Sequence, residues 1–421
     1  MTPTSLKSYL KAGLLAALTF SACSAPQRAP LDDPRSRARV LLEAGQLDQA
    51  EQLARRLAKD GQLNDQLLLA EVWIRHGKHK QVVELLSPLF KAQPKHARIA
   101  KWLALALDAT GQGERALRVY ARRLRLVPDD RNAARRFASL LLQRGNPGQA
   151  AEVAAGALKS GPKDYTLLTV LAKSQLRRGR LPMARKAAAA ATQLKPEQAD
   201  GWLVFARVEA ARGEYADAER AVVTGLKYAP QHVPSLRFYA ALLAAKKDLA
   251  GAARRISSAI AVRPDDPQLL NEFAVLQFRL GHHEAATLAL RRALKNAPKR
   301  LALHRNLIEV LLADARLSQA AEAANIALAV ARGVKGLQKS TKQTLEDSVI
   351  RALCALTMLR FVEGRGRGAK KLGLKIDRAL DGAGLHLTTS QRDAAAASVA
   401  KAVKAARRRA QKNATPPKVN P

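Results

Sequence analysis

The sequence predicts an all-α solenoid, in which pairs of helices stack along a single axis. The composition is one reason, because alanine, leucine, arginine and lysine dominate and are strong helix formers. Hydrophobic residues make up 48% of the 421 residues and aromatic residues only 4%, so small aliphatic side chains must build a large core. The second reason is that three residue types recur with a common period of 34 residues, which indicates a repeat architecture.

Proline, glycine and alanine mark three fixed places in each repeat. The prolines are Pro94, Pro128, Pro162, Pro196, Pro230, Pro264 and Pro298. The glycine series is Gly77, Gly111, Gly145, Gly179, Gly213, Lys247, Gly281 and Ala315, with two substitutions. The alanines are Ala116, Ala150, Ala184, Ala218, Ala252, Ala286 and Ala320. We interpret the glycine as a left-handed turn between two helices, the alanine as their close contact, and the proline as the end of the second helix.

Apolar residues between these marks are spaced as on one face of a helix. Trp202, Phe205 and Val208 precede the turn glycine Gly213 at intervals of three residues, so they share a face. A second repeat has Leu270, Phe273 and Phe278 before Gly281. The spacing predicts a helix-turn-helix hairpin that buries its apolar face on the neighbouring hairpins.

This pattern resembles the tetratricopeptide repeat family. Further matching marks are the small residues of the first helix, which are Ala70, Ala104, Ala138, Ala172, Ala206, Ala240 and Ala274. The resemblance implies a right-handed superhelical solenoid with C-terminal capping helices, in which the first helix of each hairpin lines a concave groove. It covers residues 37–334, about nine units, with the 34-residue period starting at residue 63 and a shorter unit at 37–62.

The N-terminal residues 1–23 are predicted to be a lipoprotein-type signal peptide. Lys7 and Lys11 precede the short apolar segment AGLLAALTF, which is the order found in secretory signals. The following FSAC resembles the lipobox of bacterial lipoproteins, which implies a lipid anchor at Cys23. Ser24 implies sorting to the outer membrane, with the protein facing the periplasm. The alternative is an ordinary cleaved signal and a soluble periplasmic or secreted protein.

The remaining segments outside the repeats are predicted as follows. Residues 24–36 contain three prolines and suit an extended tether. Residues 335–412 lack the period and are predicted to form a basic helical C-terminal cap, while residues 413–421 are predicted to be a disordered tail. The last helix of the cap has cations that could dock on an anionic surface, namely Lys401, Lys404, Arg407, Arg408 and Arg409.

No motif of catalysis or metal binding is found in the sequence. It contains no GxSxG elbow, no HExxH pair and no paired-cysteine motif. The run at 364–368 (GRGRG) lacks the ending of a phosphate loop, and the histidine pairs lie beside turn glycines, where we expect them to be solvated. We therefore assign no catalytic residue, no metal and no cofactor, and we predict a binding protein that is not an enzyme.

The resemblance implies that fixed positions of each first helix point into the groove. These positions hold mainly cationic and amide side chains: Asn64, Arg98, Lys101, Asn132, Arg135, Arg136, Lys173, Arg177, Arg207, Arg237, Asn271 and Arg305. Arginine holds carboxylate, phosphate or sulfate with paired donors, so we expect an acidic ligand there. The alternative is that these are ordinary solvated residues, because the second helices also carry rows of cations.

The formal net charge of +37 favours acidic partners. One interpretation is a non-enzymatic scaffold of the bacterial cell envelope, which binds partner proteins with acidic segments and serves the assembly of pilus, secretion or exopolysaccharide export machinery. The alternative is a periplasmic protein that binds polyanions, either acidic polysaccharide or lipopolysaccharide. Nucleic acid is disfavoured as a partner, because aromatic side chains for base stacking are scarce and the apolar N-terminus would be unexplained.

Overall fold

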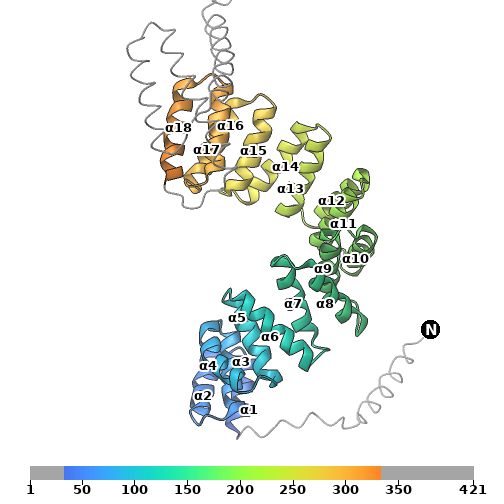
Figure 1. Cartoon of the computed structure of the whole chain (residues 1–421), viewed down its shortest axis with the longest axis vertical. Helices are drawn as coiled ribbons and strands as arrows, with labels where there is room; N and C mark the ends of the chain where they lie inside the picture. The colour runs from blue at the N-terminus through green and yellow to red at the C-terminus, as the bar shows by residue number, and fades with distance from the viewer. Residues whose placement is uncertain (1–32, 333–421) are drawn as a thin grey trace, which may run out of the picture. The chain divides into compact units, whose positions relative to one another are not determined.

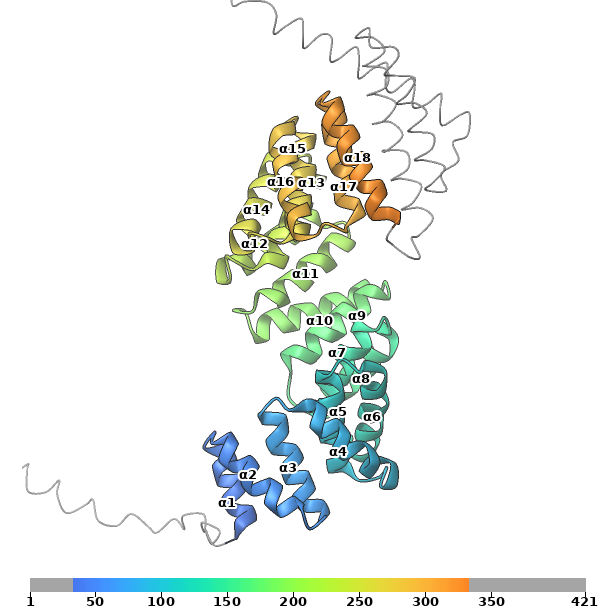
Figure 2. The same ribbon diagram turned by 90° about the vertical axis from the view of Figure 1, so that its left-hand side faces the viewer.

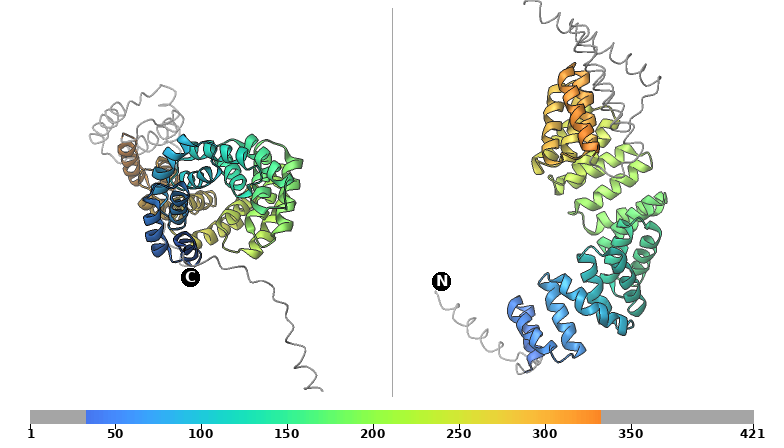
Figure 3. Two further views of the ribbon diagram at one scale, coloured as in Figure 1. Left: turned by 90° about the horizontal axis from the view of Figure 1, so that it is seen from below. Right: turned by 60° about the vertical axis from the view of Figure 1, so that its left-hand side comes forward.

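The computed structural model describes residues 33–332, which form eighteen α-helices and no β-strand (Figure 1). This confirms the predicted fold class, an all-α repeat solenoid. The chain divides into two compact units, an N-terminal unit Met1–Arg180 and a C-terminal unit Leu181–Pro421. Within each unit, helices that follow one another in the sequence pack side by side (Figures 2 and 3).

The described part of the N-terminal unit contains nine helices. They are α1 (Pro34–Glu43), α2 (Leu47–Ala58), α3 (Leu63–Arg75), α4 (His79–Ala92), α5 (Ala97–Ala109), α6 (Gly113–Leu126), α7 (Arg131–Gln143), α8 (Pro147–Lys159) and α9 (Tyr165–Arg177). The described part of the C-terminal unit also contains nine. They are α10 (Leu181–Leu194), α11 (Ala199–Ala211), α12 (Tyr215–Tyr228), α13 (Val233–Ala245), α14 (Leu249–Val262), α15 (Pro267–Arg279), α16 (His283–Asn296), α17 (Leu301–Ala313) and α18 (Leu317–Arg332).

Each hairpin turn contains one residue with a left-handed backbone, as the glycine series predicts. The φ angle is +76° at Gly77 and +85° at Gly213, and the two substituted positions adopt the same conformation, with +67° at Lys247 and +59° at Ala315. The next residue donates its backbone N–H to the carbonyl five residues earlier, for example Asp248 to Leu243 at 2.9 Å. This bond satisfies a free carbonyl at the end of the first helix and fixes the turn.

The alanine of the second helix is fully buried in every hairpin that carries it. The residues with no exposed surface at this place are Ala50, Ala116, Ala150, Ala184, Ala218, Ala252, Ala286 and Ala320. The small residue of the first helix is buried as well, as at Ala104 and Ala138. A methyl group at these places lets the backbones of neighbouring helices approach closely, so the core consists of many small contacts.

Helix α1 begins earlier than the sequence predicts. The predicted tether 24–36 ends three residues inside this helix, which starts at Pro34. Proline is tolerated at the first helical position because the N–H that it lacks would have no partner within the helix. Asp33 caps the helix, with its carboxylate accepting the backbone N–H groups of Arg35 and Ser36.

Two buried carboxylates connect a second helix to the following first helix. Glu51 of α2 is 5% exposed and accepts hydrogen bonds from Trp73 Nε1 at 3.0 Å and from Lys78 Nζ at 2.6 Å. Glu209 of α11 has no exposed surface and lies 2.8 Å from Arg185 Nε of α10. A buried charge is tolerated only when it is paired and hydrogen-bonded, so each carboxylate requires a cation in its neighbourhood.

The Glu51 contacts make stability depend on pH. Burial raises the pKa of Glu51, but hydrogen bonds from Lys78, Arg55, Trp73 and His76 outweigh burial and bring the pKa to about 2. Because this pKa is depressed on folding, the stabilisation is fully present above about pH 4.5 and is lost as the pH falls towards 2.

We predict that Lys247→Gly stabilises the chain by about 1 kcal/mol, because a left-handed backbone disfavours residues with a Cβ atom. The free energy of unfolding in urea measures the effect. Arg178→Gly is the control, since Arg178 stands directly before the turn glycine Gly179, has a φ of −88° and makes no side-chain hydrogen bond or ion pair among the described residues. Equal effects of the two substitutions would contradict this account of the turn.

We predict that Glu51→Gln lowers the free energy of unfolding at neutral pH by an amount on the order of 3 kcal/mol. The pKa of Glu51 falls from 4.5 to about 2 on folding, and each unit of that change in pKa corresponds to about 1.4 kcal/mol. The difference from the unsubstituted chain should shrink as the pH falls from about 4.5 towards 2. Glu43→Gln, at an exposed residue of α1, is the control and should have little effect at any pH. A difference that does not vary with pH would show that the carboxylate charge is not the cause.

Candidate partner-binding pockets

Seven of the twelve predicted groove residues line two pockets, one in each unit. The N-terminal pocket is lined by Lys101, Trp102, Leu105, Asp108, Tyr120, Arg123, Asp130, Asn132, Ala133, Arg135, Arg136, Ser139, Leu140, Gln143 and Thr166. The C-terminal pocket is lined by Arg207, Pro234, Arg237, Phe238, Ala240, Ala241, Ala244, Ile256, Asn271, Glu272, Val275 and Leu276. The two pockets have volumes of about 690 and 430 Å³, which lie within the usual range for ligand sites.

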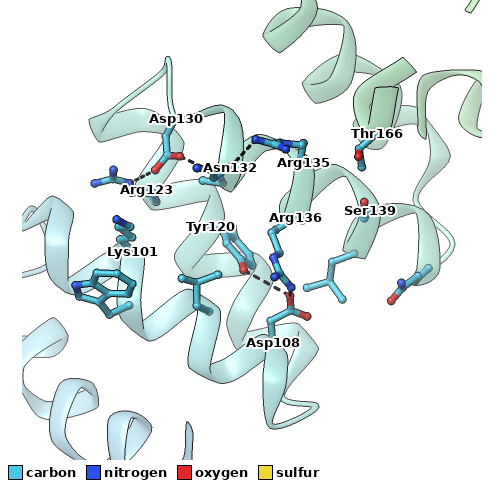
Figure 4. Close-up of a pocket in the computed structure, with 15 residues that line it drawn as sticks. Lys101, Asp108, Tyr120, Arg123, Asp130, Asn132, Arg135, Arg136, Ser139 and Thr166 are labelled. Carbon is cyan, nitrogen blue, oxygen red and sulfur yellow. Dashed lines mark hydrogen bonds and ion pairs between the residues drawn. The ribbon is translucent and has the colours of Figure 1, made fainter. Parts of the chain in front are cut away.

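Three consecutive first helices, α5, α7 and α9, contribute to the N-terminal pocket, together with α6 (Figure 4). Residues of α7 at intervals of three and four, such as Asn132, Arg136 and Ser139, share one helix face and therefore line the same wall. In Figure 4, Lys101 of α5 lies on the left, whereas Ser139 of α7 and Thr166 of α9 lie on the right. The pocket lining thus combines cations and hydroxyl groups with apolar residues, among them Leu105 and Leu140.

Part of the positive charge of this pocket is already neutralised. Arg123 Nε lies 2.7 Å from Asp130 Oδ2, and both side chains are 12% exposed. Asp130 also caps α7 by accepting the backbone N–H of Ala133, so this ion pair is part of the framework. Arg135 donates to Asn132 at 2.6 Å and lies 3.4 Å from Asp164.

Two cations of the N-terminal pocket are held more loosely. Arg136 is 61% exposed, and its nearest carboxylate oxygen, on Asp108, is 3.7 Å away. Lys101 has no carboxylate partner among the described residues, and its ammonium lies 4.2 Å from the ring centroid of Trp102. Tyr120 places its hydroxyl 3.5 Å from Asp108, and burial, followed by the charge of Asp108, raises the pKa of Tyr120, which therefore stays neutral.

The C-terminal pocket is more apolar. Helices α11, α13, α14 and α15 contribute to it, and its apolar lining includes Phe238, Val275 and Leu276. Arg237 donates two hydrogen bonds to the Glu272 carboxylate, one of them from Nε at 2.9 Å. This hydrogen bonding raises the pKa of Arg237, and the charge of Glu272 acts in the same direction.

The other predicted groove residues lie outside both pockets. Arg98 donates to Asn64 at 3.2 Å, and Arg177 donates to the backbone carbonyl of Leu142 at 2.6 Å. Arg305 contacts Asn306, which in turn donates to Asn271 at 2.7 Å. Lys173 of α9 is partly buried. Arg98, Arg177 and Arg305 are therefore already hydrogen-bonded within the protein, although from the sequence they are predicted to be available to a ligand.

Several lining residues were not predicted from the sequence. Asp108 follows Lys101 by seven residues, or two helical turns, so helical spacing could have placed it on the same face. The same reasoning applies to Val275, four residues after Asn271. By contrast, Arg123 belongs to a second helix, and no spacing within the first helices could have indicated that it reaches the pocket.

Some predicted sites cannot be compared with the structure. Cys23 and the cations Lys401, Lys404, Arg407, Arg408 and Arg409 lie outside residues 33–332. In the part of the chain that the structure describes, no group of three or more His, Cys, Asp or Glu side chains is arranged to hold a metal ion. None of the described helices is both long and apolar enough to cross a bilayer.

The fold and the pockets define an α-helical repeat protein with a concave pocket in each unit. The sequence profile of the tetratricopeptide repeat family matches residues 135–199. This segment contains α8, α9 and α10 in full, and the same arrangement of turn, buried alanine and proline recurs before and after it. Stacked helical repeats of this type create extended concave surfaces that other proteins can bind.

Several solved structures are similar to parts of this chain, and two of the three described below are of tetratricopeptide repeat proteins, from Thermus thermophilus and Parabacteroides merdae. A thermophilic protein of Thermus thermophilus has 22% identity and a TM-score of 0.37, and the comparison covers 43% of this chain and 98% of that chain. A protein of Parabacteroides merdae has 15% identity, a TM-score of 0.46, and coverages of 58% and 97%. MamA from Desulfovibrio magneticus has 15% identity, a TM-score of 0.37, and coverages of 40% and 95%. No curated protein matches the chain by sequence.

Proposed function

We propose that the chain is a non-enzymatic scaffold of the bacterial cell envelope, and that its N-terminal pocket binds an acidic segment of a partner protein. One observation carries the proposal: the pocket has four cations and two carboxylates in its lining, and Lys101 has no carboxylate partner among the described residues. An unpaired ammonium beside a concave surface attracts an anionic group from outside. The chain as a whole, at +37, also attracts such a partner from a distance.

The geometry of the pocket favours a peptide carboxylate as ligand. Carboxylates of an acidic segment would receive charge-assisted hydrogen bonds, one from Lys101 and another from Arg136. Neighbouring polar groups of the peptide would meet the hydroxyl groups of Ser139 and Thr166 in the same lining. Apolar side chains of the same peptide would pack on Leu105 and Leu140. Because the cations are partly exposed, the attraction should weaken with added salt.

We predict that charge reversal in this pocket weakens binding of a short glutamate-rich peptide to the full chain. Lys101→Glu and Arg136→Glu should each raise the dissociation constant by about tenfold or more, since each replaces an attraction with a repulsion. Fluorescence anisotropy of the labelled peptide measures the constant. The control is Arg118→Glu, which makes the same change of charge at an exposed residue of α6 outside the pocket lining.

A second candidate function, polyanion binding, has its own observation. Lys186, Arg220 and Arg254 are exposed at the same place of three second helices, α10, α12 and α14, and are 34 residues apart in the sequence. Arg118 occupies this place in α6. If Arg118→Glu weakened peptide binding as much as the pocket variants do, non-specific attraction to the basic surface would explain the binding, and the pocket would have no special role.

The N-terminal sequence supports the cellular location in this proposal. A cysteine directly after a short apolar segment is the arrangement in which bacterial lipoproteins are acylated, and we place the anchor at Cys23. The scaffold would then face the periplasm from the outer membrane and serve the assembly of envelope machinery, such as pilus, secretion or exopolysaccharide export systems.

We predict that the chain, expressed in a Gram-negative host, partitions with membranes and that Cys23→Ser releases it from them, because the acyl chains supply the apolar contact with the bilayer. Membrane fractionation and the mass of the N-terminal peptide measure the result. Ser24→Ala is the control for anchoring and should leave the acyl mass in place. An unmodified Cys23, or cleavage at another residue, would replace the anchored protein with a soluble periplasmic or secreted one.

A further inference from the structure

Arg207 is a cation without a partner in the C-terminal pocket. Among the described residues its side chain makes no ion pair and no hydrogen bond. Its guanidinium makes a cation–π contact with the Phe238 ring, 5.7 Å from the ring centroid. Desolvation by the surrounding protein lowers the pKa of Arg207, and the positive charge of Arg237 lowers it further, whereas Asp200 acts in the opposite direction. A guanidinium in this environment is stabilised by an anion that approaches through the pocket.

The neighbouring Arg237 is not available for such an anion. Its guanidinium already donates two hydrogen bonds to Glu272, and a forked pair of this kind is geometrically satisfied. The pair therefore neutralises Arg237 and leaves Arg207 as the cation that can receive a ligand. From the sequence alone, the same role is predicted for both arginines. The structure shows that they differ, because Arg237 is paired with Glu272 and Arg207 is not.

An apolar surface lies in the same pocket as Arg207. Val275 is 39% exposed, although it is a large aliphatic residue on a first helix, and it lies with Phe238 and Leu276 in the lining. The small residues Ala241 and Ala244 of α13 line the same pocket and fill little of it. An aliphatic side chain that entered the pocket would remove Val275 from water, which is favourable in proportion to the apolar area covered.

We infer that the C-terminal pocket is a second binding site, specific for an extended peptide segment in which an aliphatic residue stands next to an acidic residue. The aliphatic side chain packs on Val275, Phe238 and Leu276, and the side-chain carboxylate of the acidic neighbour pairs with Arg207. The ligand differs from that of the N-terminal pocket, because more charged residues line that pocket than this one. The two units would therefore bind two motifs of one partner, or two separate partners.

The test uses the full chain with Lys101→Glu and Arg136→Glu, so that the N-terminal pocket does not contribute. The probes are labelled, C-terminally amidated peptides with one Gly/Ser scaffold, whose central pair is Leu–Asp, Leu–Asn or Ala–Asp. Fluorescence anisotropy should show binding of the Leu–Asp peptide that is tighter than that of either other peptide by about tenfold, because each lacks one of the two contacts.

Substitutions in the pocket should remove the two preferences separately. Arg207→Gln should abolish the preference for Leu–Asp over Leu–Asn, and Val275→Ser should abolish the preference for Leu–Asp over Ala–Asp. Both residues are exposed, so the fold should tolerate these changes. Arg254→Gln, which removes one positive charge from an exposed position of α14 outside the pocket, is the matched control and should keep both preferences.

Several results would overturn this inference. The first is equal binding of all three peptides. The second is that Arg254→Gln reduces the preference for Leu–Asp over Leu–Asn as much as Arg207→Gln does. The third is binding only when the peptide ends in a free carboxylate. The two tests are independent of each other. The glutamate-rich peptide tests Lys101 and Arg136 of the N-terminal pocket, whereas the peptides used here bind a chain in which both of those residues are already replaced by glutamate. Failure of one site therefore leaves the result for the other intact.

Discussion

The close approach of paired helices at buried alanines is the constraint on which the rest of this structure depends. At Ala116 or Ala252 a single methyl group separates one backbone from the next helix, and no surface of it remains exposed. A larger side chain would push the helices apart or force a strained rotamer. The first full unit tolerates Val82 at this place, fully buried, which shows that local repacking can absorb a small increase in volume. The pocket walls stand on helices whose spacing these contacts determine.

Side chains on the first helices are connected from one repeat to the next. Arg98 donates to Asn64 over 34 residues, Arg237 to Glu272 over 35, and Asn306 to Asn271 over 35. Such contacts are possible because equivalent positions of successive first helices face the same side. In these contacts the donor groups of Arg98, Arg237 and Asn306 bind other residues of the protein, so they are not free to bind a ligand. The linings of the two pockets are therefore less basic than the net charge of the chain implies, because Arg123 and Arg237 are already paired with carboxylates.

The sequence was sufficient to predict the repeat and its turns, but not which cations are free. Periodicity is a local property, so the left-handed conformation at Lys247 and Ala315 follows from their place in the glycine series. The availability of Arg237 is not local, because it depends on a carboxylate in the next repeat. Arg123 is a similar case, since a residue of a second helix reaches the pocket lining. The extra turn at Pro34 was missed because proline was interpreted as a breaker, although it suits a first helical position.

The buried carboxylates Glu51 and Glu209 make the repeats unequal. Leucine stands at the place of Glu209 in α5, α7, α13 and α17, so these four repeats have an apolar residue where α11 has a carboxylate. Glu209 has one partner in its own repeat, Arg212, and takes a second, Arg185, from the hairpin before it. Moving that repeat elsewhere in the array, or duplicating it, would leave the buried carboxylate with one cation instead of two, because the other described second helices carry no cation at the place of Arg185. The charge of this junction thus favours one order of repeats, and copying a repeat disturbs the pairing least where the junction carries no buried carboxylate.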